Sequence, residues 1–119
     1  MPANALQADF SREGACVILH LSGALGYDNV PELQARLSYG LSTHHPPNLI
    51  VHVQSVRSVD SYGLTVLTAA ARHAGHLRGR MLVAGAGDLL QATFTRRNLN
   101  EVLAVRSTLA DAIGELHGG

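Results

Sequence analysis

Residues 58–64 read Ser58-Val59-Asp60-Ser61-Tyr62-Gly63-Leu64, and they join a β-rich run to an amphipathic helix. The first N–H groups of a helix have no partner within the helix, so the side chain of Asp60 or Ser61 is predicted to cap it. A helix start also carries partial positive charge, which would stabilise a phosphate placed there. Gly63 has no side chain and lets another part of the backbone come close. This junction is where we expect function to lie.

Alternating and apolar stretches predict the β-strands. Residues 16–21 carry apolar side chains in both alternating sets, which is typical of a strand covered on both faces, so this strand is predicted to be internal. It is preceded by Arg12-Glu13-Gly14, whose glycine suits a hairpin turn. The predicted strands are residues 6–10, 16–21, 49–53 and 80–84, with a weaker one at 102–105.

Capping residues and apolar stripes predict four helices. The first has Asp28 or Asn29 as its cap, Pro31 in its first turn and a stripe of three leucines, and the prolines at 46 and 47 follow its end. That stripe consists of Leu33, Leu37 and Leu41. The other helices are predicted from Ser61 to Ala74 with Gly75 as the stop, from Asp88 to a left-handed Asn98 or Asn100, and from Ser107 or Thr108 with Asp111 through Leu116.

The order of these elements is β-β-α-β-α-β-α-(β)-α over a chain of 119 residues. A chain of this length forms one domain, so we expect residues 1–119 to share a single core. Strand–helix–strand units require right-handed parallel crossovers. The sequence therefore predicts an α/β fold in which a mixed β-sheet packs against about four α-helices.

The composition argues against several classes of function. Nine basic residues balance nine acidic ones, so there is no net attraction to nucleic acid or to an anionic membrane. Two phenylalanines and three tyrosines are too few for a row of base-stacking rings. The only cysteine, Cys16, lies in an apolar strand and is predicted to be a buried small hydrophobe. With no recognisable signal peptide or membrane span, we expect a cytoplasmic protein that does not insert into membranes.

Three stretches carry a resemblance to a known family, namely LSGAL at 21–25, VDSYGLTVL at 59–67 and RRNL at 96–99. They resemble the STAS domain, the fold of bacterial anti-sigma factor antagonists. The second stretch is the most specific, and the resemblance spans nearly the whole chain. In that family the loop is typically Asp-Ser-Ser/Thr-Gly-Leu, and an anti-sigma factor with kinase activity phosphorylates the hydroxyl residue before the glycine. The resemblance implies a protein that binds such an anti-sigma factor when unphosphorylated and so frees a sigma factor.

The chain departs from the family pattern at two places. The phosphoacceptor position just before the glycine is Tyr62, while Ser61 matches the neighbouring serine. Family members also commonly carry Gly-Glu-Leu/Ile-Asp after the second strand, whereas this chain ends the corresponding run with Gly26 and lacks both acidic side chains. Asp28 is better explained as a helix cap than as a substitute for the missing aspartate.

Ser61 and Tyr62 have three interpretations. In the first, Ser61 and Asp60 only cap the helix and Tyr62 lies on the surface. In the second, Ser61 is the phosphoacceptor, because phosphate at a helix N-terminus is tolerated electrostatically. In the third, Tyr62 replaces the switch with a permanent aromatic contact, since tyrosine is enriched at the centres of interfaces. The sequence leaves all three open.

Neither a metal site nor an enzyme is predicted. His73 and His76 lie three residues apart near a helix end, but no third ligand converges on them. His52 lies in a buried strand and is expected to be a hydrogen-bonded core residue. Ser61 lacks the Gly-x-Ser-x-Gly context of a hydrolase nucleophile, and the glycines at 85 and 87 do not complete a dinucleotide-binding motif. We therefore expect no catalytic residue, no metal and no cofactor.

Two functions from different classes remain. The first is a regulatory protein that docks one face on an anti-sigma factor kinase. The residues expected on that face are Asp60, Ser61, Tyr62, Gly63 and Leu64, together with Tyr27. The second is a phosphorylation-independent STAS scaffold or accessory subunit, of the kind found in stressosomes, lipid-transport complexes and anion transporters. Self-association as a homodimer is compatible with both.

Overall fold

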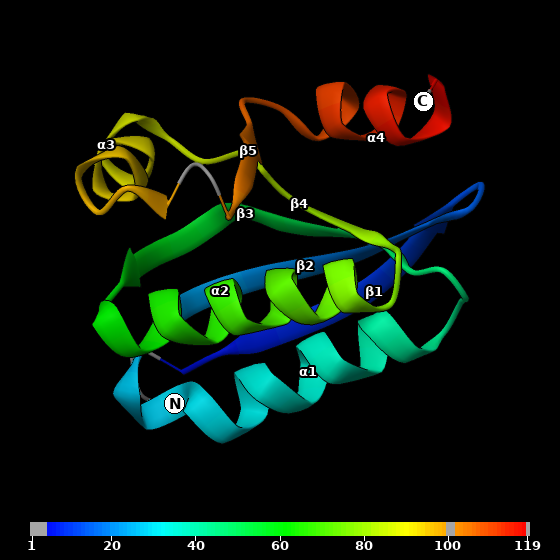
Figure 1. Cartoon of the computed structure of the whole chain (residues 1–119). Coiled ribbons are helices and arrows are strands. Elements are labelled where there is room, and N and C mark those ends of the chain that lie inside the picture. The colour runs from blue at the N-terminus through cyan, green and yellow to red at the C-terminus, as the bar shows by residue number, and fades with distance from the viewer. Residues whose placement is uncertain (1–4, 100–101, 119) are drawn as a thin grey trace.

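The computed structural model describes residues 5–99 and 102–118, in which one mixed sheet is flanked by helices (Figure 1). β1 (Gln7–Glu13) pairs antiparallel with β2 (Cys16–Leu25), and β3 (Asn48–Val59), β4 (Arg80–Ala84) and β5 (Ala104–Arg106) follow in parallel and in this order. The helices are α1 (Val30–Ser42), which the single turn η1 (Tyr27–Asn29) precedes, α2 (Ser61–His76), α3 (Asp88–Arg96) and α4 (Leu109–Gly118). The predicted α/β fold and the internal position of the strand at Cys16 are confirmed.

Two hydrophobic layers hold helices on opposite faces of the sheet (Figure 1). On one face, Leu19 and Leu21 of β2 pack with the predicted leucine stripe of α1 and with α2. On the other, Cys16 and Ile18 pack with Ala112 of α4. Cys16 is completely buried, as predicted, and burial raises the pKa of its thiol. This thiol is therefore protonated and inert near neutral pH.

Three strands, β1, β2 and β3, are longer than their apolar runs predict, whereas β4 has the predicted bounds and β5 is shorter than predicted and begins two residues later. The hairpin turn is Gly14-Ala15, with Gly14 at a φ of +60°, so Glu13 belongs to β1 rather than to the turn. β2 and β3 continue to Leu25 and Val59 because their second halves pair with each other. Beyond Val53 the residues of β3 are exposed or half-buried, so the apolar pattern that revealed its first half stops there. The pairing of Leu25 with Val59 sets the next loops side by side.

The end of α2 differs from the prediction. Gly75 does not stop this helix, which runs to His76, and Arg78 takes the left-handed conformation at a φ of 61°. The glycine that the turn requires is Gly79, because a Cβ there would lie 2.2 Å from the carbonyl oxygen of Pro47. The helix end is thus decided by a neighbouring loop and not by the first glycine in the sequence.

Two other helix boundaries test the predicted caps. Asn29 occupies the N-cap position of α1 without a capping hydrogen bond, and its side-chain amide instead donates to the carbonyl of Ala24 at 2.7 Å. Asn98 ends α3 in the left-handed conformation at a φ of 58°, as predicted. The alternative residue for that end, Asn100, lies outside the described residues.

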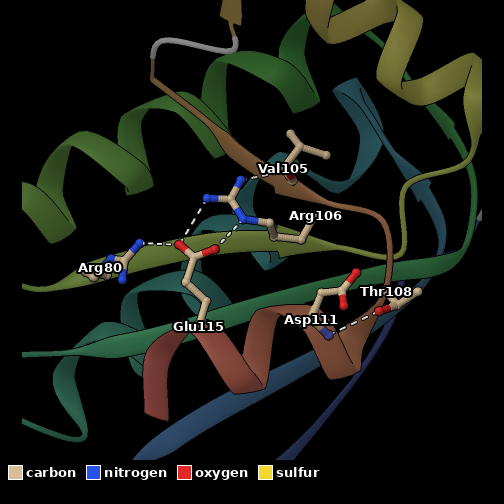
Figure 2. Close-up of polar contacts among 6 residues, drawn as sticks. All are labelled: Arg80, Val105, Arg106, Thr108, Asp111 and Glu115. Carbon is tan, nitrogen blue, oxygen red and sulfur yellow. Dashed lines mark hydrogen bonds and ion pairs between the residues drawn. The ribbon is translucent and has the colours of Figure 1, made fainter. Parts of the chain in front are cut away.

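Polar contacts tie α4 to the parallel strands (Figure 2). Thr108 Oγ1 accepts a hydrogen bond from the N–H of Asp111 at 3.1 Å, which confirms it as the cap of α4. Glu115 forms ion pairs with Arg80 of β4 and with Arg106 of β5, the latter with 2.5 Å between Oε1 and Nε. The hydrogen bonds from Arg106, with a smaller contribution from Arg80, lower the pKa of Glu115 to about 2.

Candidate functional site

Asp60 follows β3 and caps α2 with its carboxylate. Oδ1 accepts a hydrogen bond from the N–H of Gly63 at 3.0 Å, and Oδ2 accepts one from the N–H of Tyr27 at 3.0 Å. The bond from Gly63 and then that from Tyr27 lower the pKa of Asp60, so the carboxylate is ionised near neutral pH. Of the two predicted caps, Asp60 is the one that the structure confirms, while Ser61 is the first residue of the helix. The Asp60 side chain also holds the loop that follows β2.

Two glycines allow that loop and the first turn of α2 to touch. A Cβ on Gly63 would lie 2.1 Å from the carbonyl oxygen of Leu25, which confirms the close backbone approach predicted there. A Cβ on Gly26 would lie 2.6 Å from Oδ2 of Asp60. The carboxylate of Asp60 therefore occupies the space that a side chain at position 26 would need.

Tyr27 and Tyr62 form an exposed aromatic pair next to Asp60. Their ring centroids are 5.1 Å apart and their planes are inclined at 69°, an edge-to-face contact. The two residues remain 67% and 54% exposed. Asp60 bonds the backbone of Tyr27 directly and holds the helical turn that carries Tyr62, so the pair stands on a fixed backbone.

Ser61 is exposed and lines two adjoining cavities. The smaller, of about 360 Å³, is also lined by Asp60 and by Arg96 and Arg97 at the end of α3. In residues 5–99 and 102–118 no side chain is hydrogen-bonded to the Ser61 hydroxyl, so no histidine of this part is engaged with it as a base. The arginines were not among the predicted site residues, because only the fold brings the RRNL stretch to the start of α2.

Not every predicted docking residue is accessible. Leu64 is only 3% exposed and packs in the core, since it is the first apolar position of α2 that faces the sheet. Gly63 is also buried, against the backbone of Leu25. The predicted residues that a partner can reach from solvent are Tyr27, Asp60, Ser61 and Tyr62.

Two histidines, His20 and His52, form a pair, but the described residues hold no cluster suited to a metal ion. No group of three His, Cys, Asp or Glu side chains in this part of the chain could hold a metal ion. His20 and His52, on adjacent strands, place their Nδ1 atoms 3.1 Å apart, and Ser11 Oγ lies 2.8 Å from Nε2 of His20. Burial, and then the neighbouring His20, lower the pKa of His52. His52 is hydrogen-bonded as predicted, although it is half-buried rather than fully buried.

The chain as a whole resembles known proteins in sequence and in fold. A family sequence model described as "Mlab, STAS domain" matches residues 8–106. The chain belongs to the STAS domain family. This STAS domain is similar in structure to an anti-sigma factor antagonist from Mycobacterium paratuberculosis, with a TM-score of 0.86, 18% identity, and coverage of 98% of this chain and 97% of that chain.

Two further solved structures share the fold of this STAS domain. A variant of RsbS from Moorella thermoacetica gives a TM-score of 0.78 at 16% identity, covering 94% of this chain and 96% of that one. A sulfate transporter family protein from Wolinella succinogenes gives 0.72 at 19% identity, covering 85% and 84%. No curated protein sequence matches this STAS domain significantly. Among its described helices, none combines the length and apolar character needed to cross a bilayer.

Proposed function

We propose that this STAS domain is a regulatory protein-binding module of the anti-sigma factor antagonist type. It docks on an anti-sigma factor with serine kinase activity and so releases a sigma factor. The observation that carries the proposal is the exposed pair Tyr27 and Tyr62, held by Asp60 at the start of α2. The fold shared with the M. paratuberculosis antagonist supports it.

The aromatic pair suits a docking role for energetic reasons. Tyrosine offers a large contact area while only two side-chain torsions need to be ordered, so little conformational entropy is lost on binding. The backbone beneath both rings is already fixed by the bonds to Asp60, so the partner would not have to order this loop. We therefore place the centre of the interface at Tyr27 and Tyr62, with Asp60 and Ser61 beside them.

Ser61 is the proposed site of phosphorylation control. Its side chain is exposed and directly precedes Tyr62, so a phosphate there would add about two negative charges to the docking face. Arg96 and Arg97 line the same cavity as Ser61 and would favour the phosphorylated state. Phosphorylation is thus expected to change partner affinity without unfolding the start of α2.

A second function is favoured by one specific observation. The position at which the family carries its acceptor hydroxyl holds Tyr62, whose ring is engaged with Tyr27. A phosphorylation-independent scaffold or accessory subunit, stressosome-like or transporter-associated, would need the aromatic contact and no switch. The family description, which names Mlab, and the similarity to a sulfate transporter family protein are consistent with this alternative.

The test uses a purified anti-sigma factor kinase encoded next to this gene. Its affinity for wild-type protein, Ser61→Ala and Ser61→Asp is measured by calorimetry, and intact mass is recorded after incubation with ATP. Binding that Ser61→Asp weakens, with a mass gain of one phosphate that Ser61→Ala abolishes, would support the proposal. Binding that neither substitution changes, with no mass gain, would indicate the scaffold alternative. Absence of binding to the kinase would refute the antagonist function.

A further inference from the structure

The larger of the two cavities lined by Ser61 has a volume of about 560 Å³ and lies between α2 and the end of α3. Arg72 of α2 lines one side, and Arg96, Arg97 and Asn98 line the other. We refer to it as the arginine cavity. Its volume lies within the range of small-molecule sites, which is roughly 300–1,000 Å³.

The arginine cavity carries positive charge that no carboxylate of the described residues neutralises by an ion pair. All nine basic residues of the chain are arginines, and three of them line this cavity without any acidic residue in its lining. Within the described ranges, Arg72, Arg96 and Arg97 form no ion pair with a carboxylate, whereas Arg36, Arg80 and Arg106 each do. Asp60 lines the adjoining smaller cavity but not the arginine cavity, and its carboxylate is occupied by the amides of Gly63 and Tyr27.

The arginine side chains enter the cavity from two helices, α2 on one side and the end of α3 on the other. Arg72 belongs to the long helix α2, and the left-handed residue Asn98 ends α3 directly after Arg96 and Arg97. One nitrogen of Arg96 is 3.3 Å from Thr93 Oγ1, and the remaining N–H groups of its guanidinium are available to a ligand. The planar guanidinium groups match the oxygen geometry of phosphate, which they bind with paired hydrogen bonds.

We propose that the arginine cavity binds a phosphomonoester, a small molecule whose phosphate contacts Arg72, Arg96 and Arg97. The hydroxyl of Ser61 and the side-chain amide of Asn98 supply two further uncharged donors. The cavity is several times larger than a phosphate ion needs, and Ala69 and Leu99 line it as well. The organic part of the ester lies against these apolar side chains. Tyr27 and Tyr62 do not line the cavity, and Ser61 is the residue that it shares with the proposed docking face, so binding of the ester can be measured without the partner.

The test is a titration in phosphate-free buffer with two probes, inorganic phosphate and phenyl phosphate, with phenol as the uncharged comparison. Calorimetry gives the affinity, and amide chemical shifts of labelled protein give the location. We expect saturable binding of phenyl phosphate, weaker binding of inorganic phosphate, no binding of phenol, and shifts centred on Ser61, Arg72 and residues 96–98. Added sodium chloride should weaken binding, because the recognition is electrostatic.

Variants decide whether the three arginines are responsible. Arg72→Gln, Arg96→Gln and Arg97→Gln should each weaken phenyl phosphate binding by about tenfold, since each removes charge-assisted hydrogen bonds. Arg36→Gln is the matched control, because it removes an exposed arginine from α1. Lack of saturable binding, or equal weakening by the control, would overturn the proposal. Equal affinity for inorganic phosphate and phenyl phosphate would refute specificity for a phosphomonoester and would indicate a site that binds only the anion. Thermal unfolding confirms that each variant is folded.

Discussion

The Oδ2 atom of Asp60 lies 3.0 Å from the backbone nitrogen of Tyr27, a residue 33 positions earlier in the chain. The other carboxylate oxygen caps α2 through the amide of Gly63. One side chain therefore fixes the start of the helix and the loop after β2 together. The aromatic pair that we assign to partner binding depends on this link.

Removal of the Asp60 carboxylate should destabilise the domain and loosen the Tyr27 loop. We expect Asp60→Ala to lower the free energy of unfolding by about 1 to 2 kcal/mol, because the helix loses its cap and the Tyr27 amide loses its acceptor. Asp60→Asn keeps an acceptor oxygen and should cost less. Urea denaturation measures both variants, and an unchanged midpoint for Asp60→Ala would contradict the assigned role.

Two glycines of α2 should respond in opposite ways to the same substitution. Gly63→Ala places a methyl group 2.1 Å from the carbonyl oxygen of Leu25 and should destabilise the protein by about 3 kcal/mol. Gly75→Ala meets no atom within 4 Å and should be neutral or stabilising by up to about 1 kcal/mol. Thermal or urea unfolding provides the comparison. Similar effects at both positions would show that the helix start is not packed as described.

Tyr62 should behave as a binding hot spot. We expect Tyr62→Ala to weaken partner affinity by about 2 kcal/mol, because it removes an exposed ring from the centre of the proposed interface. Tyr39 is the control, since it is 59% exposed but lies on α1 against Phe10. Calorimetry with the partner should show unchanged affinity for Tyr39→Ala. If Tyr62→Ala binds the partner as tightly as wild type does, the tyrosine pair is not part of the interface.

The His20–His52 pair should make the fold less stable in mildly acidic solution. The pKa of His52 lies below its ordinary value of 6.5, so the unfolded chain binds this proton at a higher pH than the folded protein does. Stability is therefore lost as pH falls through about 6.5 and continues to fall until His52 titrates in the folded state. Urea denaturation at about pH 7.5 and about pH 5.5 should show a smaller loss for His52→Gln than for wild type. Equal losses of stability in wild type and His52→Gln would show that His52 does not cause the pH dependence.

The ion pairs of Glu115 should stabilise the folded state only at pH values at which its carboxylate is ionised. Its folded pKa is about 2, below the value of 4.5 for a free glutamate, so its contribution is present above about 4.5 and is lost as pH falls toward 2. Glu115→Gln should therefore flatten the acid dependence of unfolding in this range. Glu32→Gln is the control, because its ion pair with Arg36 is long, at 3.6 Å, and exposed. The idea fails if both variants change the acid transition equally.

Local signals in the sequence were sufficient for much of the site. The close approach at Gly63 was predicted, and Asp60 as the cap and Asn98 as the left-handed residue were each one of two predicted candidates. Each of these features depends on the chemistry of one residue and its immediate neighbours. The leucine stripe of α1 was predicted for the same reason, since the helical spacing of its apolar residues can be recognised in the local sequence.

Other features depend on segments that are distant in sequence. Gly75 was predicted to end α2, but the helix continues to His76. The turn that follows requires a glycine at position 79, where the chain packs closely against Pro47. The second half of β3 is too polar to be recognised as a strand, and it forms because β2 pairs with it.

The sequence by itself determined the fold class and the helix start at 58–64, because apolar periodicity and capping act over a few residues. The tertiary structure alone decided that Tyr27 and Tyr62 meet, that Leu64 is buried, and that three arginines line the same cavity as Ser61. These contacts join residues from different loops and helices, and no local pattern encodes a distance between them. Sheet pairing and helix packing bring them together, and with them the surfaces to which we assign function.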